Sequence, residues 1–167
     1  MNEKKELRGL GGWLILVAIG LVLSASAVLV SIYPFFEMLS AEKWEILAAF
    51  EPETFNSELR SIIFAEIGFN ILLFFAFLYV IYLFFSKHYL FPKFFIAIQV
   101  VVIFYILVDS YVVSLIPPME PMLDYDTIKS LVRALIYAAF WITYMLKSER
   151  VKQTFVEHRP VNKNING

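Results

Sequence analysis

The sequence predicts an all-α fold, a polytopic bundle of four transmembrane helices, on three observations. Hydrophobic residues make up 60% of the 167 residues and charged residues only 17%, whereas a soluble domain usually carries about 25% charge to keep its surface hydrated. The apolar residues form continuous runs instead of the alternating segments of about 10 residues that are typical of outer-membrane barrels. Four of these runs reach the roughly 20 residues that a helix needs to cross the bilayer.

The four predicted spans cover about 11–33, 61–85, 94–116 and 128–146. We expect the first span to end at Pro34 and the third at the Pro117-Pro118 pair, because proline removes a helical hydrogen bond. The fourth is the least hydrophobic, since two basic residues lie in its first turns. Residues 1–158 are interpreted as a single transmembrane domain and residues 159–167 as a disordered tail.

The connection between the first two spans, residues 34–60, is the longest segment expected outside the membrane. Leu39, Trp44 and Leu47 fall near one face of a short helix, which would lie on the membrane surface with Trp44 at the headgroups. A partly ordered loop with a turn at Pro52 fits the sequence equally well.

The first span also has features of a cleaved signal peptide. Lys4 and Lys5 precede the apolar run, and the small residues at 25–27 are typical of a cleavage site. However, the apolar run continues through Val28 and Ile32, so cleavage would leave a hydrophobic remnant. We therefore expect an uncleaved transmembrane helix.

Basic residues indicate which ends of the spans face the cytoplasm. They gather before the first span, between the second and third spans, and after the fourth: Lys4, Lys5, Arg8, Lys87, Lys93, Lys147, Arg150, Lys152, Arg159 and Lys163. The connections on the other side carry few basic residues and many acidic ones. Because cytoplasmic segments carry an excess of lysine and arginine, both termini are predicted to lie in the cytoplasm.

Composition excludes several classes of function. The net charge of −1 provides no field that would favour nucleic acid. The chain has no cysteine, which excludes disulfides, thiol catalysis and cysteine-ligated metal. His88 and His158 are far apart in the sequence and lack a second ligand at metal spacing, so we interpret them as solvated loop residues. We expect no metal, no cofactor and no nucleic-acid partner.

Four polar residues of the predicted spans form a candidate cluster in a region where an unpaired polar group is costly: Glu66, Asn70, Asp109 and Arg133. At about 1.5 Å per residue, Glu66 and Arg133 lie roughly 8 Å, and Asp109 roughly 11 Å, from the outer ends of their spans. Asn70 follows Glu66 by one helical turn and shares its face. We predict an internal salt bridge between Arg133 and Asp109, with Glu66 nearby. The alternative is a proton or ion relay, or a ligand site.

The first span carries a stripe of small residues at helical spacing: Gly20, Ser24, Ala27 and Ser31. Small residues let membrane helices approach closely, so we interpret the stripe as a packing face.

Two segments near the ends of the chain carry a distinctive pattern of residues. The first is Gly-Leu-Gly-Gly-Trp-Leu-Ile-Leu at residues 9–16. The second is Trp-Ile-Thr-Tyr-Met-Leu at 141–146, followed by Ser-Glu-Arg-Val-Lys-Gln-Thr-Phe-Val at 148–156. Together they resemble a bacterial inner-membrane family, domain of unknown function 2569. Thr143 stands where family members usually have proline. The resemblance implies a four-helix protein of the bacterial inner membrane and supplies no established activity.

The same two segments contain the residues that we predict to anchor the bundle at the cytoplasmic interface: Trp13, Trp141, Tyr144, Arg150, Lys152 and Phe155. The chain after the fourth span is expected to continue along the membrane surface. Val151 and Phe155 would then enter the lipid, while Arg150 and Lys152 contact anionic headgroups.

The sequence favours a non-enzymatic structural, accessory or interaction subunit. No nucleophile with an adjacent base can be identified, and Glu66 and Asp109 are the only candidate catalytic pair. The alternative is a small oligomeric channel or transporter for protons or a small solute. The expected partners are the lipid bilayer and either another membrane protein or a second copy of the chain.

Overall fold

The structure, a computed structural model, describes residues 9–50, 52, 55, 57–114 and 123–158. The helices in these residues are α2 (Trp13–Ser31), α3 (Tyr33–Met38), α4 (Ala41–Phe50), α5 (Ser57–Phe85), α6 (Phe91–Ser114), α7 (Tyr125–Lys147) and α8 (Glu149–Thr154). Four helical stretches are long and apolar enough to cross a membrane: Trp13–Met38, α5, α6 and α7. The all-α, four-span prediction is therefore confirmed, and α7 is the least hydrophobic span, as predicted. The predicted tail and the Pro117-Pro118 pair lie outside the described residues.

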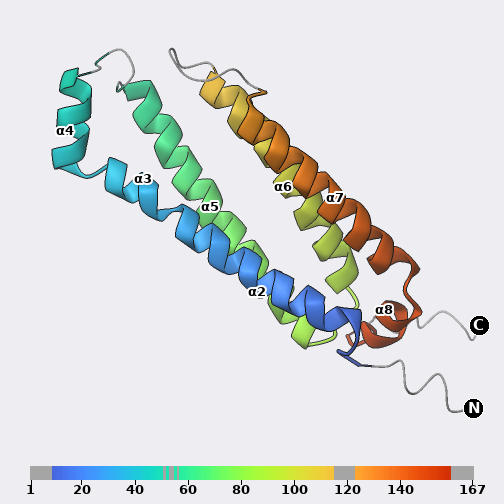
Figure 1. Cartoon of the computed structure of the whole chain (residues 1–167). Helices are drawn as coiled ribbons and strands as arrows, with labels where there is room; N and C mark the ends of the chain where they lie inside the picture. The colour runs from blue at the N-terminus through green and yellow to red at the C-terminus, as the bar shows by residue number, and fades with distance from the viewer. Residues whose placement is uncertain (1–8, 51, 53–54, 56, 115–122, 159–167) are drawn as a thin grey trace, which may run out of the picture.

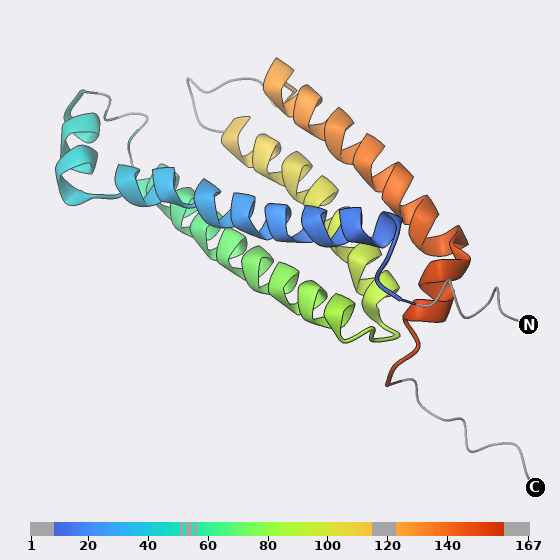
Figure 2. The same ribbon diagram turned by 60° about the horizontal axis from the view of Figure 1, so that its bottom comes forward.

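The four spans form two antiparallel pairs (Figure 1). α2 packs along α5, and α6 packs along α7, whereas α5 and α6 contact each other more sparsely. Figures 1 and 2 both show the two pairs meeting at the end where α8 lies and diverging toward the other end. We call the first the junction end, which contains Gly9–Gly12, the α5–α6 turn and α8. We call the second, which contains α4 and the start of α7, the open end.

The first membrane-length helix continues through Pro34, where the sequence predicted its end. Ile32, between α2 and α3, keeps helical backbone angles, with φ −74° and ψ −27°. Pro34 lies in the first turn of α3, where its missing N–H removes no helical hydrogen bond. The helical stretch Trp13–Met38 is therefore longer than the predicted 11–33.

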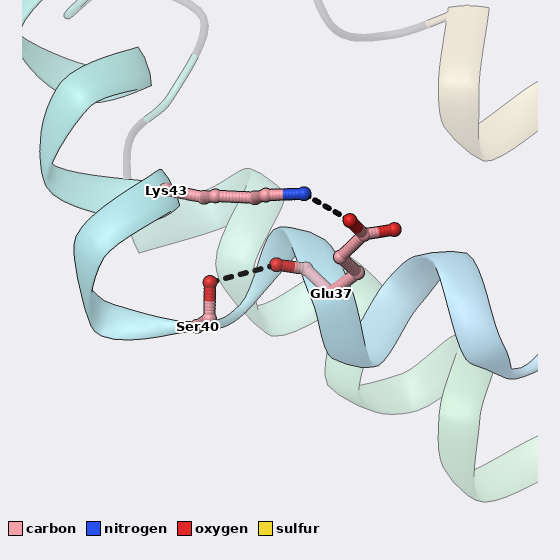
Figure 3. Close-up of polar contacts among 3 residues, drawn as sticks. All are labelled: Glu37, Ser40 and Lys43. Carbon is pink, nitrogen blue, oxygen red and sulfur yellow. Dashed lines mark hydrogen bonds and ion pairs between the residues drawn. The ribbon is translucent and has the colours of Figure 1, made fainter.

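The sequence allowed either a short helix or a partly ordered loop after the first span. The structure has the helix, α4, at the open end. At the turn into α4, the Ser40 hydroxyl donates to the Glu37 carbonyl at 2.9 Å, and Lys43 forms an ion pair with the Glu37 carboxylate (Figure 3). Trp44 is half-buried, with the guanidinium carbon of Arg60 5.3 Å from its ring centroid. Trp44 therefore packs partly against its own chain, and its contact with headgroups stays a prediction.

The main hydrophobic core lies at the junction end, where all four spans and α8 meet. Its buried residues are Leu14, Val17, Leu21, Ala25, Leu73, Phe77, Val80, Leu83, Phe84, Phe91, Phe95, Ile98, Trp141, Met145, Val151 and Phe155. A smaller buried cluster at the open end joins α2 only to α5: Ile32, Leu59, Ile63 and Ile67. The two helix pairs are therefore held to each other mainly at the junction end.

The segment before α2 packs on α8. The Gly9 N–H donates to the Thr154 hydroxyl at 3.1 Å, and this hydroxyl donates to the Gly9 carbonyl at 3.3 Å. A Cβ atom at Gly11 would lie 3.1 Å from a guanidinium nitrogen of Arg150, so little space is left for a side chain. Gly12 has φ 59°, which favours glycine. The two segments that carry the family resemblance are thus in contact.

Helix α8 is buried under the bundle, whereas the sequence predicted a helix on the membrane surface. Ser148 is extended, with φ −69° and ψ 121°, and its hydroxyl caps α8 at the Val151 N–H. The chain therefore turns at Ser148 instead of continuing along the surface. Phe155 is 2% exposed, and its ring stacks on Phe91 with centroids 4.4 Å apart. Phe155 and Val151 are core residues, and the prediction that they enter the lipid is wrong.

The remaining predicted anchors fall into two groups. Trp13 and Lys152 are exposed, as an anchor requires, and their contact with headgroups stays a prediction. Trp141 is buried in the core, and Tyr144 and Arg150 are partly buried against it. Trp141 therefore joins the helices instead of marking the interface.

His88 and His158 were expected as separate solvated residues, but their rings stack with centroids 5.1 Å apart. Backbone hydrogen bonds support this contact: the Tyr89 N–H donates to the Glu157 carbonyl at 3.1 Å, and the Glu157 N–H donates to the Lys87 carbonyl at 3.2 Å. Within the described residues, no three His, Asp or Glu side chains are placed to hold a metal ion. The contact attaches the chain after α8 to the α5–α6 turn.

Asp124 caps the start of α7. Its carboxylate accepts hydrogen bonds from the N–H groups of Thr127 at 3.0 Å and Asp126 at 3.3 Å. Hydrogen bonds from Thr127, and then from the backbone of Asp126, hold the pKa of the Asp124 carboxyl below its usual range. The cap is fully formed above the ordinary aspartate pKa of about 4 and is lost as the pH falls through the lowered pKa. It starts α7 at Tyr125, earlier than the predicted residue 128.

We expect Phe155→Ala to destabilise the whole bundle, because it leaves a cavity beside Phe84 and Phe91 in the main core. Such a truncation costs about 3–5 kcal/mol of unfolding free energy. Thermal unfolding in detergent measures the loss. Lys152→Ala, on the exposed side of α8, is the matched control and should change stability by less than about 0.5 kcal/mol. A Phe155→Ala protein as stable as its parent would show that α8 is not part of the core.

Candidate functional site

Asn70 on α5 makes hydrogen bonds that join three helices, and it is only 6% exposed. The amide nitrogen donates to a Glu66 carboxyl oxygen and to the Tyr105 hydroxyl of α6, both at 3.2 Å. The amide oxygen accepts from the Ser31 hydroxyl of α2 at 3.3 Å. A polar group in the bilayer core has no water to bind, so these side chains must satisfy one another.

Glu66 and Asp109 face each other between α5 and α6. Their carboxyl groups are in hydrogen-bonding contact, and both residues are partly buried. A hydrogen bond between two carboxyl groups requires a proton on one of them, because carboxylates are acceptors only. The sequence predicted a cluster that contains both residues, and the structure brings them together with Asn70.

A groove runs along the seam between α5 and α6 and contains the two carboxyl groups. Its volume is about 540 Å³. Apart from the carboxyl groups and the Tyr105 hydroxyl, its lining is apolar: Ile62, Ala65, Phe69, Val100, Val101, Phe104, Val108 and Val112. A second hollow, of about 290 Å³, continues along the seam and shares Phe69 and Val101 with the first. We call the larger hollow, with its lining residues, the α5–α6 groove.

The ring of Tyr105 is held in this groove by Phe69, on which it stacks with centroids 4.1 Å apart. The stack crosses from α5 to α6 next to Asn70, which follows Phe69 in the sequence, and one turn away from Asp109. It therefore fixes the position of the hydroxyl that accepts the Asn70 hydrogen bond.

Arg133 does not belong to this cluster. It is exposed on α7 and does not line the α5–α6 groove. Among the described residues, the ion pairs are Lys43–Glu37 and Lys152–Glu149, so the predicted salt bridge from Arg133 to Asp109 is not formed within one copy of the chain. An arginine in the middle of a span costs about 2.5–3.5 kcal/mol on insertion scales. That cost leaves Arg133 in need of a partner.

Ser31 and Tyr105 are the cluster members that sequence reasoning missed as site residues. Ser31 was assigned only to the packing stripe of α2. Tyr105 precedes Asp109 by four residues, as Glu66 precedes Asn70, so each helix carries two polar residues one turn apart. Two such pairs at a similar depth on consecutive spans are the signal that would have identified Tyr105.

A family model described as "Protein of unknown function (DUF2569)" matches residues 7–156. The chain belongs to the DUF2569 family. The matched range includes all four spans, α8 and the α5–α6 groove of this DUF2569 protein. Comparisons with curated proteins and with solved structures return no match. The function of the groove must therefore be argued from its own chemistry.

We expect Asn70→Leu to destabilise the protein, because it removes the hydrogen bonds that link α5 to Ser31 and to Tyr105. Hydrogen bonds between membrane helices average about 0.6 kcal/mol and reach about 1.7 kcal/mol, so losing two should cost about 1–3 kcal/mol. Unfolding in mixed detergent micelles measures the change. Tyr105→Phe is the matched control, since it removes one of these bonds, keeps the ring stack on Phe69 and should cost about 0.6 kcal/mol. Equal stability of the two variants would contradict a linking role for Asn70.

Proposed function

We propose that this DUF2569 protein is a non-enzymatic subunit of the bacterial inner membrane that binds another membrane component through the α5–α6 groove. The observation that carries the proposal is a groove of about 540 Å³ with apolar walls and two carboxyl groups, Glu66 and Asp109, inside a span. An acidic group at this depth is costly unless a partner satisfies it. A membrane helix that carries one cationic or hydrogen-bond-donating side chain has the matching chemistry.

The walls of the groove support binding within the bilayer. Phe104 is 67% exposed and Val100 and Val101 are also exposed, although all three line the groove. Large apolar side chains around a few polar groups are typical of binding sites, in which the polar groups provide orientation. The bilayer itself covers such side chains at no cost, so the carboxyl groups are what selects a partner over lipid.

The lining of the groove favours binding over catalysis. Beside the two carboxyl groups, the lining residues include no serine, threonine, lysine, histidine or cysteine that could act as a nucleophile. We therefore propose a site that recognises and does not transform its partner.

One observation favours the alternative, a proton transporter. Hydrogen bonds connect Ser31, Asn70 and Glu66, and the Glu66 carboxyl group contacts that of Asp109, so the polar groups form a chain across three helices. A transporter needs this chain to continue to the other side of the membrane. Among the described residues, the buried polar ones are Asn70 and Thr154, and Thr154 lies at the junction end, where its hydroxyl is bonded to Gly9. No buried polar residue of the described chain lies between them to continue the relay. This arrangement supports binding more than conduction.

We also propose that the junction end faces the cytoplasm, because the basic residues of the sequence gather in the segments at that end. Reporter fusions measure this orientation. A fusion after Lys87, in the α5–α6 turn, should report cytoplasm, and a fusion after Lys43, in α4, should report the outside. An exported reporter at Lys87 would contradict the proposed orientation.

A photoreactive phenylalanine analogue in the groove tests the proposed function. At Phe104, which lines the groove, illumination of cells should yield a discrete cross-link to a membrane protein. The cross-link should disappear in a Glu66→Gln/Asp109→Asn background, because the selecting groups are gone. Leu23, 63% exposed on α2 and outside the groove, is the matched control and should cross-link only to lipid. Lipid cross-links alone from Phe104 would overturn the proposal.

A further inference from the structure

Helix α7 presents an exposed face that carries an unpartnered cation. Residues at three- and four-residue spacing share this face: Lys129, Val132, Arg133, Ile136 and Phe140. In the part of the chain that the structure describes, Arg133 has no hydrogen bond and no ion pair. The ammonium of Lys129, by contrast, lies 5.9 Å from the ring centroid of Tyr125. We call these five exposed residues the α7 face.

The α5–α6 groove offers the complementary chemistry. Its carboxyl groups require hydrogen-bond donors, and a guanidinium carries five N–H donors in a planar fork. Its walls are apolar, as are the neighbours of Arg133 on the α7 face. The groove and the α7 face share no residue, so one chain carries both halves of the contact on separate surfaces.

The two surfaces also lie at a similar depth in the membrane. At about 1.5 Å per residue, Glu66 lies roughly 13 Å from the first residue of α5, and Arg133 roughly 12 Å from the first residue of α7. Asp109 lies roughly 8 Å from the last described residue of α6. All three positions are in the half of the spans nearer the open end. Two copies side by side in one membrane would therefore place Arg133 of one copy at about the depth of the carboxyl groups of the other, and neither copy would have to tilt.

This depth favours a second copy over a lipid headgroup. A lipid amine lies at the membrane surface, at the end of the spans, whereas Glu66 lies deeper in the bilayer. A guanidinium on a transmembrane helix can reach the acidic pair at the same depth. A protein partner with an exposed arginine at this depth is already present wherever the chain itself is present. Self-association also gives Arg133 hydrogen-bond acceptors and uses the remaining acceptor capacity of the two carboxyl groups.

We propose that copies of the chain associate head to tail, with the α7 face of one copy in the α5–α6 groove of the next and Arg133 bound to Glu66 and Asp109. This inference rests on the proposed function of the groove, and it names the partner. The contact joins two different surfaces, so it is heterologous and builds a ring when the rotation between copies closes. The groove is incomplete without Arg133 from the neighbouring copy.

Two variants test the contact in trans: Arg133→Leu, and the double variant Glu66→Gln/Asp109→Asn. Each alone should be monomeric in mild detergent, or associate roughly tenfold more weakly than the parent. A mixture of the two should form dimers and nothing larger, because only one productive contact remains. Light scattering measures the assemblies. Lys147→Leu, which removes one exposed positive charge from α7 outside the α7 face, is the matched control and should assemble like the parent. A monomeric parent, parent-like assembly of Arg133→Leu, or no dimer in the mixture would overturn the proposal.

Engineered thiols test the same contact without changing any charge, so the test holds even where Arg133→Leu fails to fold. The chain has no cysteine of its own. Oxidation should link a Val108→Cys copy, with its thiol in the groove, to an Ile136→Cys copy, with its thiol beside Arg133. Neither variant should link to itself, and Val30→Cys, exposed on α2, should link to neither. A link between two Val108→Cys copies would indicate a two-fold interface and reject the head-to-tail arrangement.

These results separate the two proposals. A monomeric parent whose groove still cross-links to another protein would reject self-association and leave the proposed function of the groove intact. Lipid cross-links alone from the groove would reject both.

Discussion

The packing of Phe155 against Phe84 and Phe91 is the contact on which the arrangement of the helices depends. It seats the end of α8 between α5 and α6, and α8 in turn holds Gly9, the entry to α2, through Thr154. All four spans therefore meet at the junction end. Among the described residues, no comparable core joins the pairs at the open end, where the smaller buried cluster links α2 to α5. The divergence of the pairs follows from this one-sided attachment.

The open half accordingly depends on polar contacts for its cohesion. A hydrocarbon environment provides no hydrophobic force between helices, so hydrogen bonds and close packing must hold them. Asn70 supplies such bonds to α2 and α6, and the Glu66–Asp109 pair supplies another between α5 and α6. The same carboxyl groups lie in a groove that other side chains do not fill. One cluster thus has a structural role and keeps unused hydrogen-bonding capacity.

The sequence predicted the fold class and the approximate spans because length and hydrophobicity determine both. It predicted the composition of the polar cluster less well, because hydrophobicity alone does not show which face of a membrane helix points toward its neighbours. On α5, for example, Phe75 is exposed and Phe77 is buried, although both are phenylalanines. The common depth of Asp109 and Arg133 indicated a pair, because the apolar pattern of α6 does not show which way Asp109 faces. Helix α7 is amphipathic, and its exposed polar stripe of Asp126, Lys129 and Arg133 was the signal that Arg133 faces away from the bundle. The predicted location of α8 was wrong for a related reason. An apolar stripe with Val151 and Phe155 suits a lipid surface and a protein core equally.

Both segments that carry the family resemblance lie at the junction end, and this has a consequence for what membership in the DUF2569 family implies. Gly9, Gly11 and Gly12 contact Thr154 and Arg150, so the two segments form a single packing unit. None of these residues lines the α5–α6 groove. The segments therefore specify how the helices are joined, whereas Glu66 and Asp109 provide the polar chemistry of the groove. If copies associate as we propose, a related chain that shares the junction but lacks the acidic pair would keep the fold and would have no use for a cation at the depth of Arg133.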